Sequence, residues 1–85
     1  MHGNVSIMHC IHIGSLIKAE LAKQERTISW FARKLYCDRS NVYDIFRRKS
    51  IDTDLLLRIS HVLNHDFFQY YNRLYDETLS CEKSC

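Results

Sequence analysis

The stretch TISWFARKLYCDRSNVYDIFRRK, residues 27–49, contains two short helical patterns separated by a turn. In the first pattern, apolar residues recur at helical spacing, and these residues are Ile28, Phe31, Ala32 and Leu35. Thr27 stands directly before this stripe, where its hydroxyl can accept a hydrogen bond from an early backbone N–H. The first pattern therefore predicts a helix over 28–35 that begins at a Thr27 cap.

The second pattern follows Asp38, whose carboxylate suits the positive end of a helix. Its narrow apolar stripe is Val42, Ile45 and Phe46, and it predicts a helix over 39–47. The opposite face carries hydrogen-bonding and charged side chains, namely Arg39, Ser40, Tyr43, Asp44 and Arg47. A helix of this kind shows a polar surface to water, and the major groove of DNA is wide enough to admit it.

These residues resemble the helix-turn-helix of Xre-type proteins, the class of the phage repressors and Cro. The likeness rests on Phe31-Ala32 and Leu35, a short turn, and then Asp38-Arg39-Ser40-Asn41-Val42 with Ile45. It spans roughly residues 12–70 and is closest to short members that continue as Asp52–Leu56 and Asp66–Phe68 do here. The resemblance implies an all-α, five-helix, repressor-like DNA-binding bundle, with the helix-turn-helix at its second and third helices.

Two features of the chain depart from that class. The class usually has Gly in the turn, where this chain has Tyr36, and left-handed backbone costs a non-Gly residue ~1 kcal/mol. We therefore expect a differently shaped turn at Tyr36. The class also often ends its second helix with Glu followed by Arg-Gly, where this chain has Phe46-Arg47-Arg48.

The resemblance assigns contacts with DNA bases to the polar face of the second helix. The expected base-contacting residues are Arg39, Ser40, Asn41, Tyr43 and Asp44. Arginine can bind the O6 and N7 edge of guanine with two hydrogen bonds, and aspartate can accept one from cytosine N4. For Asn41 and Tyr43 three outcomes stay open: contact with a base, contact with a phosphate, or no contact with DNA. The alternative for the whole set is an ordinary solvated helix face.

Basic residues concentrate in the same stretch. Residues 33–49 hold six Lys or Arg and two Asp, a local charge of 6 − 2 = +4, whereas the formal net charge of the chain is +2. The expected phosphate-contacting residues are Thr27, Ser29, Arg47, Arg48 and Lys49. Phosphate contacts supply affinity without sequence information. A charge run favoured by the helix dipole is the alternative for the last three residues. Trp30 is open between the DNA backbone and packing on the preceding helix.

The rest of the chain predicts three further helices, over 12–25, 53–63 and 67–76. The 53–63 segment is apolar nearly all round, which makes it the expected centre of the core, with Asp52 as its cap. We expect one helix-turn-helix domain over 12–76, with flexible tails at 1–11 and 77–85.

The 67–76 segment holds more large apolar and aromatic residues than one intramolecular face needs. We expect Phe67 and Tyr70 to turn inward and the other side of the helix to face a second copy of the chain. The expected interface residues are Phe68, Tyr71, Leu74 and Tyr75. One recognition helix contacts too few base pairs to select a genomic site, so a homodimer is expected at least on DNA. The alternative is that this helix closes the core of the monomer and that the dimer forms only on DNA.

Other functional classes lack their sequence signals. An 85-residue chain without an apolar run of ~18 residues predicts one domain and no membrane span. The first residues do not form a convincing secretory signal, so a cytoplasmic location is expected. Cys10, Cys37, Cys81 and Cys85 are then reduced thiols. No catalytic constellation or Gly-rich phosphate loop appears, so neither an enzyme, a cofactor nor a small-molecule substrate is expected.

Two groups of residues contain possible metal ligands. His9, Cys10 and His12 could combine with Cys81 and Cys85, but these spacings match no closed zinc pattern and favour a chance cluster. His61 and His65 share a helical face without an adjacent third ligand, which favours surface histidines, so no metal is expected.

Two alternatives to DNA binding stay open. One is an antitoxin-like protein-interaction module on the same fold, which the aromatic last helix favours and the basic run 47–49 disfavours. The other is a regulator gated by cysteine redox chemistry or by a metal.

Overall fold

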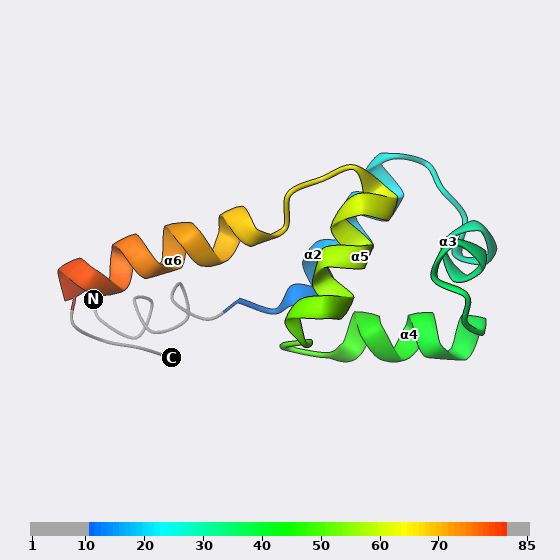
Figure 1. Ribbon diagram of the computed structural model, residues 1–85, viewed down its shortest axis with the longest axis horizontal. Coiled ribbons are helices and arrows are strands. Elements are labelled where there is room, and N and C mark those ends of the chain that lie inside the picture. Colours follow the sequence, from blue (N-terminus) through cyan, green and yellow to red (C-terminus); the bar gives the residue numbers. More distant parts are fainter. Residues whose placement is uncertain (1–10, 82–85) are drawn as a thin grey trace.

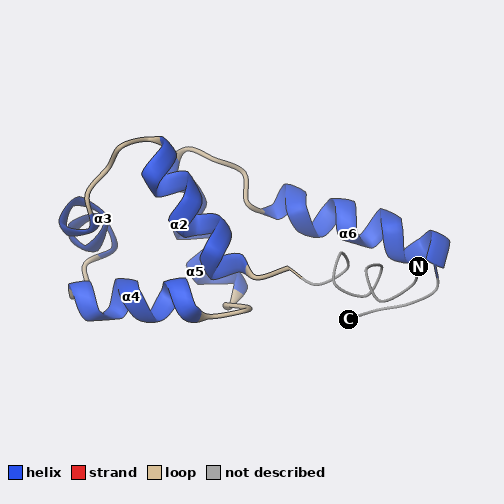
Figure 2. Ribbon diagram, turned by 180° about the vertical axis from the view of Figure 1, so that it is seen from behind, coloured by secondary structure: helices blue, strands red, loops and turns tan. Residues whose placement is uncertain are grey.

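The computed structural model describes residues 11–81, with side chains as far as residue 76. This part of the chain forms five helices: α2 (Ile13–Lys23), α3 (Ile28–Leu35), α4 (Arg39–Arg47), α5 (Thr53–Leu63) and α6 (Phe68–Cys81). No strand occurs within residues 11–81, as Figure 2 shows, and the predicted all-α class with five helices is confirmed.

Helices α2 to α5 pack into one body, from which α6 leads away to one side (Figure 1). The most extensive helix contacts join α2 to α4, α3 to α4, and α3 to α5. Among the described residues, α6 makes no helix contact of that extent. The second helix of the sequence pattern, α4, is thus packed by two neighbours, whereas α6 is attached mainly near its start.

The core combines the inner stripes of α2 to α5 with one residue before α6. Its buried members are Ile13, Ile17, Leu21, Phe31, Ala32, Leu35, Val42, Ile45, Phe46, Leu56, Ile59, Leu63 and Phe67. The apolar stripes predicted for α3 and α4 are therefore confirmed. Helix α5 packs against the core along one side only, because Leu55 and Val62 are partly buried and Leu57 is 49% exposed. It is therefore not buried all round, as the expected centre of the core would be.

Gly14 brings the start of α2 against the end of α4. The N–H groups of Ile13 and Gly14 donate to the carbonyls of Lys49 and Arg48, each at 3.0 Å. These two bonds satisfy donors at a helix start and acceptors at or just beyond a helix end, which otherwise lack partners. A Cβ at Gly14 would lie 2.6 Å from the carbonyl carbon of Phe46, closer than real contacts allow. Only glycine therefore fits this position.

The predicted N-caps differ in their hydrogen bonds. The Thr27 hydroxyl accepts from the Trp30 N–H at 3.0 Å, and the Asp52 carboxylate accepts from the Leu55 N–H at 2.7 Å, so both predicted caps are confirmed. Asp38 occupies the cap position of α4 but makes no side-chain capping bond. The cap of α2 is His12, which the sequence pattern did not indicate.

Helix bounds agree with prediction for α3, α4 and α5, and differ for the two outer helices. Helix α2 ends at Lys23 rather than residue 25, because Glu25 takes positive φ and closes the helix. Helix α6 continues to Cys81 rather than ending at residue 76, since no Gly or Pro interrupts 77–81. No helix in the described part of the chain is long and apolar enough to span a membrane.

The turn between α3 and α4 differs from expectation. Tyr36 takes the left-handed conformation, φ 58° and ψ 47°, that glycine favours at such positions. Its N–H donates to the Arg33 carbonyl at 3.2 Å, and the Cys37 N–H donates to the Ala32 carbonyl at 3.0 Å. These two bonds form a Schellman cap. The expectation of a differently shaped turn was wrong, because the cap holds the tyrosine in the strained conformation.

Tyr36→Gly is expected to raise the free energy of unfolding by up to ~1 kcal/mol, measured by urea denaturation. The substitution removes the left-handed strain, and only part of this gain is lost to the greater freedom of glycine in the unfolded chain. Little packing is lost, because Tyr36 is 91% exposed. Asn64→Gly is the matched control: Asn64 has φ 51° in an equivalent cap, but asparagine tolerates this conformation. If both variants change the free energy of unfolding equally, or if Tyr36→Gly is less stable than the wild type, Tyr36 is not strained.

The start of α6 is fixed by an aromatic and polar cluster. Phe67 is fully buried, and the His65 ring packs edge-on against it with 4.7 Å between ring centroids. His65 Nε2 lies 2.9 Å from the Tyr70 hydroxyl, and its Nδ1 lies 3.6 Å from a Glu20 carboxylate oxygen of α2. Phe67 and Tyr70 thus turn inward as predicted. The surface interpretation holds for His61, which is exposed, but is wrong for His65.

Candidate nucleic-acid interface

Helix α4 is buried along one side and open along the rest of its surface. Val42 is fully buried, and Ile45 and Phe46 are 6% and 8% exposed. The exposed residues are Arg39, Ser40, Asn41, Tyr43, Asp44 and Arg47. All five residues expected to contact bases therefore lie on the open surface of one nine-residue helix. Its position is set by packing on α2 and α3.

Two side-chain contacts order the exposed surface of α4. Arg47 Nη2 donates a hydrogen bond to Asp44 Oδ1 within an ion pair, although the two side chains are 71% and 56% exposed. The Tyr43 ring, half exposed, stands edge-on to Phe46 with 6.3 Å between ring centroids. The Asp44 carboxylate thus already has a cationic partner within its own helix, which sequence spacing alone did not establish.

The two residues that follow α4 have hydrogen-bonded backbone carbonyls and exposed side chains. The carbonyls of Arg48 and Lys49 accept the hydrogen bonds from the start of α2, while both side chains are exposed. On α3, Thr27 and Ser29 are also exposed. The Thr27 oxygen accepts the capping bond from Trp30, which leaves its hydroxyl hydrogen able to donate. All five residues expected to meet phosphates are therefore accessible.

Two basic side chains contact the ring of Trp30 on α3. The Arg26 guanidinium carbon is 4.5 Å from the centre of a Trp30 ring, and the Lys34 ammonium is 5.9 Å away. Such cation–π contacts attract basic side chains to an aromatic ring by about 0.5–1 kcal/mol at exposed sites. Trp30 is partly buried and also packs against the core. Sequence reasoning missed this cluster, whose signal was the four-residue spacing of Arg26, Trp30 and Lys34.

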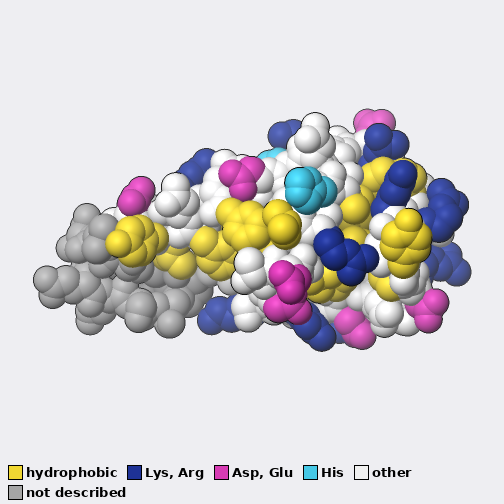
Figure 3. All heavy atoms as spheres, in the orientation of Figure 1, with side chains coloured by type: hydrophobic (Ala, Val, Ile, Leu, Met, Phe, Trp, Pro, Cys, Tyr) yellow, Lys and Arg dark blue, Asp and Glu magenta, His cyan; other side chains and the backbone are white. Residues whose placement is uncertain are grey.

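The surface charge is uneven. Lys and Arg side chains gather at the end of the molecule formed by α3, whereas both charge signs occur along the lower edge near α4 (Figure 3). Apolar side chains follow α6 on the same face. The basic region thus adjoins the exposed surface of α4 rather than that of α6.

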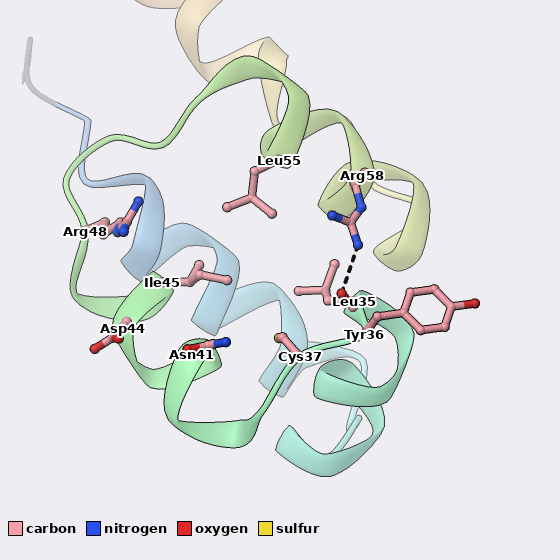
Figure 4. A pocket seen from close by; sticks show the side chains of 9 residues that line it. All are labelled: Leu35, Tyr36, Cys37, Asn41, Asp44, Ile45, Arg48, Leu55 and Arg58. Atoms are coloured by element: carbon pink, nitrogen blue, oxygen red, sulfur yellow. Dashed lines mark hydrogen bonds between the residues drawn. The ribbon is translucent and has the colours of Figure 1, made fainter.

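A cleft of about 320 Å³ opens where the end of α3 meets α4 and α5 (Figure 4). Leu35, Ile45 and Leu55 line its apolar part, and Arg48 and Arg58 contribute guanidinium groups. Arg58 donates a hydrogen bond to the Leu35 carbonyl at 2.9 Å and so ties the end of α3 to α5. The volume is at the lower limit of small-molecule pockets. Arg58 was not among the residues singled out from the sequence.

Cys37 borders the cleft and is partly exposed. Burial raises the pKa of its thiol, the nearby Asp38 carboxylate adds to the rise, and Arg58 opposes it. The thiol is therefore protonated near neutral pH, which makes it a weak nucleophile. His9, Cys10 and Cys85 lie outside the described residues, as does the side chain of Cys81. Among the described residues, no three His, Cys, Asp or Glu side chains are placed to hold a metal ion.

Comparison with known proteins returned no match. No family model matches the chain, and neither a curated protein nor a solved structure is significantly similar to it. The functional assignment therefore depends on the geometry and charge of α3 and α4.

Proposed function

We propose that this protein binds duplex DNA sequence-specifically, with α4 in the major groove, as a cytoplasmic transcriptional regulator of the Xre-like helix-turn-helix kind. The observation that carries the proposal is the open polar surface of α4, a helix buried only through Val42, Ile45 and Phe46. The major groove accepts a helix of this kind. The basic α3 end beside α4 supplies the positive charge that attracts the phosphate backbone.

Residues divide into two roles in this proposal. Arg39 lies in the first turn of α4, the part of a recognition helix that contacts base edges, and Ser40 and Tyr43 flank it. Lys49 follows the end of α4, and Thr27 and Ser29 lie at the start of α3, where exposed donors can meet phosphates. Base contacts confer sequence preference, whereas phosphate contacts confer affinity for any duplex.

A salt titration with two alanine variants tests this division. Arg39→Ala is expected to cost ~1–3 kcal/mol on the preferred duplex and to relax the preference at one base pair. Lys49→Ala is expected to weaken all duplexes about equally and to flatten the log–log salt dependence by about one unit. Fluorescence anisotropy on a selected duplex and a random duplex measures both effects.

Ala22→Ser, an exposed change in α2 on a different helix, is the control and should leave both affinities unchanged. If Arg39→Ala and Lys49→Ala lose affinity equally on both duplexes, α4 does not select the sequence. Binding by the wild type that does not weaken with salt rejects the phosphate contacts altogether.

We further propose that two copies bind one palindromic site through α6. Support comes from Tyr75, which is 62% exposed, and from Phe68, Tyr71 and Leu74, which are only partly buried. Phe68 and Tyr71 also pack against the core, so they are shared between the monomer and any interface. Sedimentation of the protein with a palindromic duplex should give two chains per duplex. One chain per duplex at saturation would contradict the dimer.

The exposed Tyr75 and the partly buried Phe68, Tyr71 and Leu74 of α6 also favour the second candidate function, an antitoxin-like protein-interaction module. Such a module needs no phosphate contacts, so its binding to a random duplex should be negligible at any salt concentration. The salt titration therefore separates the two functions.

A further inference from the structure

The middle of the exposed surface of α4 is the side directly opposite its buried residues. Helical geometry places Ser40, Asp44 and Arg47 within about 60° of one another. Their side of the helix is directly opposite the buried Val42, Ile45 and Phe46. Arg39 lies on the flank of this surface, nearer to the buried side. If α4 enters a groove with this side inward, Arg47 faces the groove floor from the last turn of α4, whereas Arg39 lies in the first turn.

The ion pair between Asp44 and Arg47 bears on orientation more than on stability. Both side chains are more than half exposed, and exposed ion pairs contribute little to folding because solvent screens them. The bond engages one N–H of Arg47 Nη2. A guanidinium has five N–H donors in a rigid planar arrangement, so enough remain to contact another group with two hydrogen bonds. In the structure, Asp44 thus holds the Arg47 guanidinium beside its own carboxylate, on the side of α4 opposite the core.

We propose that Arg47 contacts the O6 and N7 edge of a guanine and that Asp44 is its positioning residue. This inference rests on the proposed DNA binding and changes two assignments within it. Arg47 moves from a phosphate contact to a base contact, and Asp44 acts through Arg47 instead of accepting from cytosine N4. An oriented guanidinium loses less freedom when it forms the two bonds, and the unpaired Asp44 carboxylate would repel phosphates if Arg47 turned away.

Binding-site selection on random duplex tests the proposal with the wild type, Asp44→Ala, Asp44→Asn, Arg47→Ala and Arg47→Lys. Arg47→Ala and Arg47→Lys are expected to lose about 10- to 100-fold of the preference for guanine at one base pair. Lysine retains the charge but not the planar pair of donors. Asp44→Ala should relax the same base pair without weakening random duplex, and Asp44→Asn, which retains an oxygen acceptor, should restore part of the preference.

The combined variant Asp44→Ala/Arg47→Ala should lose no more preference than Arg47→Ala alone, because the two residues act as one unit. Unchanged melting temperatures are expected for all variants, since both side chains are exposed. If Asp44→Ala and Arg47→Ala relax different base pairs, Asp44 contacts its own base and the positioning role is rejected. If Arg47→Ala weakens every duplex equally and lowers the salt dependence by about one unit, Arg47 is a phosphate contact. A wild type that selects no sequence rejects the DNA-binding proposal and this inference together.

Discussion

Gly14→Ala is expected to lower the free energy of unfolding by about 2–4 kcal/mol, measured by urea denaturation. A Cβ at this position meets the backbone of Ile45 and Phe46, which cannot move aside as the end of a flexible side chain can. Separating α2 from α4 also weakens the two backbone hydrogen bonds from Ile13 and Gly14. Helix propensity acts in the opposite direction by ~1 kcal/mol, because alanine favours helix more than glycine does. The sign of the change therefore shows which effect dominates.

Ala22→Gly is the matched control, since it makes the reverse exchange at an exposed position of the same helix. Only propensity acts there, so a loss of ~1 kcal/mol is expected. If Gly14→Ala instead stabilises the protein by a similar amount, the close approach of α2 and α4 is wrong. Because the contact fixes the end of α4, the same variant should also weaken duplex binding.

The parts of the fold that sequence predicted correctly depend on neighbours along the chain. The stripes of α3 and α4 follow from helical periodicity, and the Thr27 and Asp52 caps follow from residue type at a helix start. The Gly14 contact could not be predicted in this way, because it joins residues more than thirty positions apart. The same limit applies to Arg58, whose hydrogen bond reaches the Leu35 carbonyl across 23 positions.

At the candidate site, sequence predicted the positions of side chains but not their contacts. The sequence placed the polar residues of α4 on an exposed surface, and the structure agrees. It did not reveal that Asp44 is paired with Arg47, because a spacing of three permits the contact but the rotamers decide it. For the same reason, the spacing of Arg26, Trp30 and Lys34 was visible but the stacking was not. Contacts between side chains, rather than their positions on helices, required the structure.

The second large effect is expected at the base of α6, where Phe67→Ala should cost ~3–5 kcal/mol of unfolding free energy. Phe67 is fully buried, so its removal leaves a cavity in the core and takes away the ring that packs against His65. His65 also contacts Tyr70 of α6 and Glu20 of α2. Without the Phe67 ring beneath it, the cluster that fixes α6 to α2 is weakened. Amide hydrogen exchange should therefore accelerate first in α6, at denaturant concentrations where α3 and α4 are still protected.

Phe68→Ala is the matched control, because Phe68 is the next residue and the same side chain but only partly buried. Its own cost should be clearly smaller than that of Phe67→Ala at low protein concentration, where the monomer dominates. If α6 joins two copies, Phe68→Ala also removes interface area, so its cost should grow with protein concentration. Equal costs at every concentration would show that Phe67 is not a core residue and that α6 is not held by the cluster around His65.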